Sequence, residues 1–277
     1  KRLLALIAHD GRQIKIRYIM SDITEKNLNF WQKHPVLKPY LDEAIIDFAK
    51  YDIEKDRSID LIVSGETLAS GSLKNPLIVF ANYLFDSVVA DVFKVSGDEL
   101  YASLVNLSTD EGNLDAKSPR NWEKVTVGYE DELVADNYYD DPIIDELLNS
   151  YRGLLSDSYL HFPIGSIRGL KALAALSDNK MLLLTSDKGY VSVDELDELE
   201  HPELAFHGSF SLMVNFHAIS SYFDMLGGSS YMQQPFDGFA TGAFMLGIES
   251  SKMPRANAML QEQASGFCPG HYFCLYE

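Results

Sequence analysis

One short segment limits the possible folds of this chain more than any other. Residues 77–81 read Leu-Ile-Val-Phe-Ala without a polar break. Such a run is typical of a β-strand covered on both faces, as in the centre of a parallel sheet. Further apolar runs at 14–20 and 181–185 alternate with helix-favouring segments at 24–28 and 164–176. This alternation predicts an α/β fold in which helices cover a mostly parallel sheet.

Two parts of the chain depart from this pattern. Residues 92–95 and 100–105 alternate as a β-hairpin does, and a polar insertion follows, with eight acidic and no basic residues between 130 and 146. That composition usually marks a solvated loop or a lid. The last third predicts a helix and then two strands, at 218–226, 231–234 and 243–248. We therefore expect a Rossmann-like sheet, mostly parallel, with a polar insertion and an antiparallel end.

The expected organisation has four parts. They are residues 1–106, the cofactor-side half of the domain; 107–157, the acidic insertion or lid; 158–250, the second half; and 251–277, a C-terminal extension.

Charge and composition limit the partners. The formal net charge is −18, which disfavours binding to nucleic acid because phosphate backbones are bound by Lys and Arg. A cationic ligand or an arginine-bearing protein is favoured instead, and solubility alone is the alternative explanation. No stretch reaches the ~20 apolar residues of a membrane span. Two cysteines do not make a disulfide framework, so a reducing compartment, the cytoplasm, is expected.

The two cysteines lie close together in the chain. Cys268, His271 and Cys274 are three metal-competent side chains without a fourth ligand nearby. A structural zinc site needs four, so we predict no metal site.

Two aspartates follow predicted strands. Asp22 comes after the strand at 14–20, where a carboxylate can accept hydrogen bonds from a ribose diol. Asp52 follows the next strand and can meet an adenine edge in the same way. Each has a structural alternative: Asp22 can cap the helix that follows, and Asp52 can be a turn residue.

The end of the apolar run at 77–81 is the most informative position. Asn82 ends this predicted strand, and Asp86 lies one helical turn beyond it, so both can face the same mouth. An amide and a carboxylate there can orient a nucleophile for methyl transfer, an in-line displacement in which positioning matters most. The alternative is that Asn82 is a helix cap and Asp86 a surface residue.

Read in order, several of these segments resemble one enzyme family. Residues 75–87, 183–190, 213–219 and 241–247 are similar to motifs of the MidA-like class I methyltransferases, relatives of the mitochondrial complex I assembly factor that methylates a protein arginine. The resemblance implies S-adenosylmethionine as cofactor and a protein side chain, with arginine as the implied residue, as acceptor.

The same resemblance implies roles for five residues. Asp22 and Asp52 would contact the ribose and adenine, Asn82 the cofactor and the acceptor, Asp86 the acceptor, and Tyr83 would shape the mouth between them.

Three departures from the family pattern leave a second function open. Tyr83 stands where the family has glutamate, Asn215 stands where it has aspartate, and the glycine-rich cofactor loop would precede Lys1. We interpret the apolar run at 3–8 as the trimmed end of a helix, so the first strand and this loop would be missing. The alternative function is a methyltransferase-like scaffold or assembly factor without catalysis.

Overall fold

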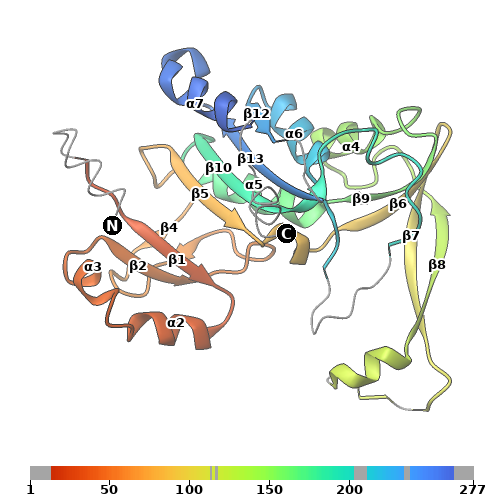
Figure 1. Ribbon diagram of the computed structural model, residues 1–277, viewed down its shortest axis with the longest axis horizontal. Helices are drawn as coiled ribbons and strands as arrows, with labels where there is room; N and C mark the ends of the chain where they lie inside the picture. The colour runs from red at the N-terminus through yellow and green to blue at the C-terminus, as the bar shows by residue number, and fades with distance from the viewer. Residues whose placement is uncertain (1–13, 113, 116–117, 203–210, 234–237, 265–277) are drawn as a thin grey trace, which may run out of the picture.

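The computed structural model describes residues 14–112, 114–115, 118–202, 211–233 and 238–264. Four β-sheets and the helices between them make up this part of the chain (Figure 1).

The first sheet contains two parallel strands. β1 (Tyr18–Asp22) pairs with β2 (Ile46–Lys50), with Tyr18 opposite Ile46. Helices α2 (Glu25–Gln32) and α3 (Lys38–Asp42) connect them. Leu28 of α2 packs with Ile46 and Phe48 in a small apolar cluster of its own. The strand and helix predicted at 14–28 are therefore confirmed in type, with later starts.

The largest sheet is built around a long strand, β10 (Met181–Tyr190). β5 (Leu77–Asn82) and β11 (Val214–Asn215) pair with it in parallel, and β13 (Phe239–Leu246) pairs with it antiparallel. β12 (Ser229–Met232) follows β13 at the outer edge. Before β5, a short hairpin forms the third sheet, from β3 (Ile59–Asp60) and β4 (Thr67–Leu68).

The region after Asp91 forms its own antiparallel sheet in the order β8-β7-β6-β9. Its strands are β6 (Asp91–Ser96), β7 (Glu99–Ser108), β8 (Thr126–Leu133) and β9 (Asp157–Phe162). β7 pairs with β8 from Tyr101 to Ser108, and the two strands extend away from the rest of the molecule as a two-stranded ribbon (Figure 1). The acidic stretch at 130–146 is thus not one loop, because it contains the end of β8 and the start of a helix.

The described part of the chain contains four further α-helices. They are α4 (Pro142–Asn149), α5 (Ile164–Ala175), α6 (Phe216–Met225) and α7 (Pro254–Ala264), with short 3₁₀ turns η1 (Phe85–Ser87), η2 (Pro119–Lys124) and η3 (Ser250–Lys252). Buried side chains of α5 and α6, such as Leu170 and Phe223, join one large core with Phe93 and Phe244 of the sheets.

The prediction of a mostly parallel, Rossmann-like sheet is wrong for the described residues. Six of the nine strand pairings are antiparallel, and the sheets have two to five strands each. There are two physical reasons. The polar region after Asp91 builds an antiparallel sheet of its own, and the parallel β1–β2 pair makes no hydrogen-bonded ladder with β5.

Within the described ranges, none of the helices combines the length and apolar character that crossing a bilayer requires.

Candidate functional site

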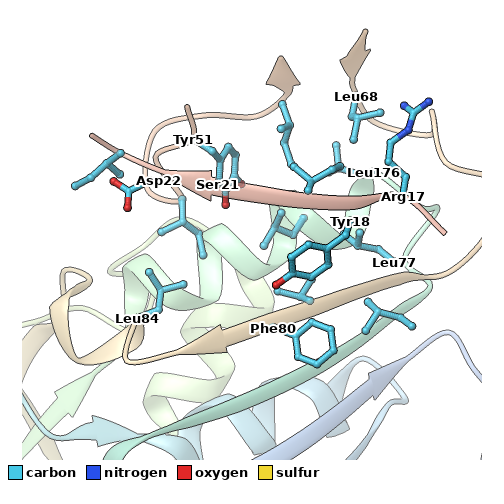
Figure 2. Close-up of a pocket in the computed structure, with 17 residues that line it drawn as sticks. Arg17, Tyr18, Ser21, Asp22, Tyr51, Leu68, Leu77, Phe80, Leu84 and Leu176 are labelled. Carbon is cyan, nitrogen blue, oxygen red and sulfur yellow. The ribbon is translucent and has the colours of Figure 1, made fainter. Parts of the chain in front are cut away.

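A groove separates β1 from β5 (Figure 2). The two strands run in the same direction, from the end marked by Arg17 and Leu77 to the end marked by Asp22 and Leu84. The groove has a volume of about 360 Å³ and a mainly apolar lining. Its lining includes Ile19, Ile53, Leu77, Val79, Leu173 and Leu176. Polar side chains gather at its carboxyl-end mouth, where β1 and β5 stop.

Asp22 lies at this mouth and also organises the start of α2. Its Oδ1 accepts hydrogen bonds from the backbone N–H and the Oγ1 hydroxyl of Thr24, at 2.7 and 2.6 Å, and its Oδ2 accepts one from Asn27 Nδ2 at 2.8 Å. Burial acts to raise the pKa of Asp22, but these hydrogen bonds outweigh it and leave the pKa below its ordinary value. Asp22 is therefore a carboxylate at the predicted position, and the hydrogen bonds from Thr24 and Asn27 fix its orientation.

Asp52 is engaged in a turn and does not line the groove. Its Oδ1 accepts from the backbone N–H of Glu54 at 3.1 Å, and its Oδ2 lies 2.7 Å from Lys55 Nζ. The hydrogen bond from Lys55 lowers the pKa of Asp52. The neighbouring Tyr51 and Ile53 line the groove instead.

Asn82 and Tyr83 lie at the carboxyl end of β5, as predicted, and both are exposed. Tyr83 has a positive φ of 53°, which turns the chain sharply out of the strand, and its ring lies 5.5 Å from that of Phe239. The turn η1 begins after Leu84 and has no side-chain cap, so Asn82 does not cap it.

Asp86 lines a second pocket on the other side of this turn, with a volume of about 380 Å³. His161 of β9 and Lys188 and Tyr190 of β10 line it as well, together with Met213. The pocket therefore combines a carboxylate, an ammonium group, a phenol and an imidazole from elements far apart in the chain.

Asp187 fixes the backbone of Asp86. Its side chain is fully buried, and its two oxygens accept hydrogen bonds from the backbone N–H groups of Asp86, at 3.2 Å, and Lys188, at 2.9 Å. Burial raises the pKa of Asp187, and the charge of Asp86 raises it further.

His161 contributes an imidazole to this pocket. It is buried, and burial lowers its pKa below the ordinary value. Its Nδ1 lies 3.3 Å from the backbone oxygen of Met213, which only accepts, so we assign the proton to Nδ1. The Nε2 atom then carries the lone pair.

Asn215, by contrast, has a structural role. Its side chain accepts a hydrogen bond from the backbone N–H of Ala218 at 2.8 Å and caps α6. Asparagine and aspartate cap helices about equally well, so this difference from the family pattern has a simple structural account.

The geometry brings some predicted residues together and separates others. Leu84 lines the groove and Asp86 lines the second pocket. Because these residues are two positions apart, their Cα atoms lie at most about 7 Å from each other. Asp22, at the end of β1, lies at the same end of the groove, whereas Asp52 points into its own turn.

Sequence reasoning missed two residues of this site. His161 was one of several histidines in apolar surroundings, and only the pairing of β9 with β6 brings it to Asp86. Asp187 was part of a motif but had no assigned role. Asp187 could have been predicted as a site residue because it follows the buried apolar strand at 181–185.

No group of three or more potential metal ligands forms among the described residues, and Cys268, His271 and Cys274 lie outside them.

No family model, curated protein or solved structure matches this chain.

Proposed function

We propose that this protein transfers a methyl group from S-adenosylmethionine to a protein side chain, with arginine as the acceptor. One observation carries the proposal: Leu84 lines the groove, and Asp86, two residues further along the same short turn, lines the second pocket. A donor at the mouth and an acceptor in the pocket would be adjacent there, which an in-line transfer requires.

The side chains at the mouth fit the adenosine part of this cofactor. A carboxylate offers about four lone-pair sites, and Asp22 uses three of them for Thr24 and Asn27. One remains for a ribose hydroxyl. Ile23 and Leu84 line the groove there and add apolar surface for a purine. Asp22 and Asn82 would hold the cofactor, which when bound supplies an electrophilic methyl group.

The pocket supplies groups that suit a guanidinium acceptor. Asp86 can accept two parallel N–H bonds from it and fix its plane. Asp187 acts on this carboxylate indirectly, since it holds the backbone N–H of Asp86. In its neutral form, with the Nδ1 proton directed at Met213 O, His161 has a lone pair on Nε2 that can accept the proton that the nitrogen loses on methylation.

The decisive test replaces Asp86. We expect Asp86→Asn to lower kcat/KM for methylation of an arginine peptide by about 100-fold, because the guanidinium loses its orienting charge. The measurement is transfer of a labelled methyl group, with Asp110→Asn as a control at an exposed aspartate away from both pockets. An unchanged rate in Asp86→Asn would remove Asp86 from the proposed mechanism.

The cofactor site is tested separately by calorimetric titration of S-adenosylmethionine into the protein at its natural length. We expect Asp22→Asn to weaken binding by about tenfold, since one charged hydrogen bond to the ribose is lost. Asparagine keeps an oxygen for both hydrogen bonds from Thr24 and loses only the one from Asn27, so most of the contacts at the start of α2 are preserved. If the natural-length protein binds no cofactor, the scaffold function becomes the better account.

A further inference from the structure

Among the described residues, no strand pairs with the edge of β1 that faces the groove. The backbone N–H of Tyr18 donates to Ile45 O at 2.7 Å, and the C=O of Asp22 accepts from the N–H of Tyr51 at 3.2 Å, both on the β2 side. Backbone groups alternate in direction along a strand. Those of Ile19 and Ser21 therefore point away from β2, toward the groove.

The edge of β5 across the groove is free in the same way. The backbone N–H groups of Leu77 and Tyr83 donate to the β10 side, to Lys180 O at 2.9 Å and to Ser186 O at 3.0 Å. The alternate groups, those of Ile78 and Phe80, point toward the groove. Within the described part of the chain, no strand pairs with either of these two edges.

β5 has the composition of an inner strand and the position of an outer one. Natural edge strands are usually protected by charged residues, prolines or bulges, and residues 77–81 contain none of these. Ile78 and Phe80 are 57% and 58% exposed. Beneath them, the groove is lined by Leu173 and Leu176 at the end of α5.

We propose that this groove binds an extended apolar peptide strand of a partner polypeptide, which lies parallel to β1 and β5 and bonds to both edges. A strand has backbone groups on two sides, and here each side meets unpaired groups of matching kind. Its side chains would cover apolar surface on both faces. This inference does not depend on methyl transfer, because it concerns the body of the groove and not the residues at its mouth.

The test is amide hydrogen exchange by NMR on the natural-length protein, before and after addition of a synthetic peptide, acetyl-Lys-Val-Thr-Val-Ile-Val-Lys-amide. We expect exchange at Ser21 and Phe80 to slow by about tenfold or more on binding. The amides of Met20 and Val79 point to β2 and β10 and serve as internal references. A peptide of the same sequence with a backbone N-methyl group on every residue, so that neither side can pair, has the same charge and should not protect these amides.

A pair of variants tests the location. Ile78→Lys places a charge in the lining and should weaken peptide binding by about tenfold, whereas Ile62→Lys, at a 45% exposed position outside the lining, should not. Both positions are exposed, so neither change should prevent folding.

Four results would overturn the proposal. Unchanged exchange at saturating peptide, or equal protection by the methylated peptide, would show that the edges do not bind a strand. Protection already present in the monomer without peptide would show that the protein's own polypeptide fills the groove. Protection that grows with protein concentration alone would assign the groove to a second copy of the chain.

Discussion

Asp86 and Asp187 are two acidic residues held together by one backbone hydrogen bond, and their charges interact. Burial is the main reason that the pKa of Asp187 is raised, and Asp86 is the next. We therefore expect Asp86→Asn to lower the pKa of Asp187. The midpoint of the Asp187 carboxyl carbon shift in an NMR titration measures it, and an unchanged midpoint would contradict the assigned coupling.

The same shift determines how Asp187 affects stability. A raised pKa means that the folded protein holds this proton more tightly than the unfolded chain does. The resulting stability is fully present below the ordinary pKa of 3.8 and is lost as the pH rises through the raised value. Ionisation of Asp187 above that pH therefore costs stability, and its two backbone hydrogen bonds reduce the cost.

At the scale of elements, the short pairing of β10 with β11 depends on a glycine. Gly189 lies opposite Val214, and a Cβ at this position would collide with the backbone oxygen of Val214 and lie 2.8 Å from the Phe216 ring. We expect Gly189→Ala to lower the free energy of unfolding by about 1–3 kcal/mol through overpacking. Urea denaturation measures this loss. Gly112→Ala is the control, since nothing lies within 4 Å of its added Cβ, and an equal loss there would contradict the packing explanation.

The helices and strands also show which parts of the fold the sequence patterns predict. The type of β1, β5, β10, α5 and α6 followed from apolar runs, alternation and helical spacing. The type of β2 followed from its place before a polar turn, because its period is ambiguous. β9 was missed, since Asp157–Phe162 mixes polar and apolar residues and is defined by its pairing with β6. The sheet arrangement was predicted wrongly because pairing partners depend on contacts between distant segments, which periodicity does not contain.

The residues of the candidate site also fall into those that the sequence predicts and those that it does not. The strand-end positions of Asp22, Asn82 and Asp86 followed from where apolar runs stop. Asp52 also follows a strand, but the nearby Lys55 draws its carboxylate into a local turn. His161 reaches Asp86 only through the antiparallel sheet that the polar region builds, so no local motif could reveal it.

For the whole molecule, 41 acidic against 23 basic residues give a field that attracts basic polypeptides. If the acceptor is an arginine-bearing protein, its KM should rise between about 0.05 and 0.5 M salt, because screening shortens the reach of these charges. Methylation kinetics measure it, with kcat expected to stay unchanged. An acceptor peptide with neutral residues around the arginine should respond less, and a salt-independent KM for the basic peptide would argue against electrostatic recruitment.

The β7–β8 ribbon has one more consequence. Its outer part reaches beyond the main core, and its paired residues from Val105 to Ser108 are exposed. Changes in length at that end would leave the packing of the buried residues unaltered. The ribbon is therefore where insertions and deletions could accumulate over evolutionary time at little cost to folding, and where an added tag or reporter domain would be best tolerated.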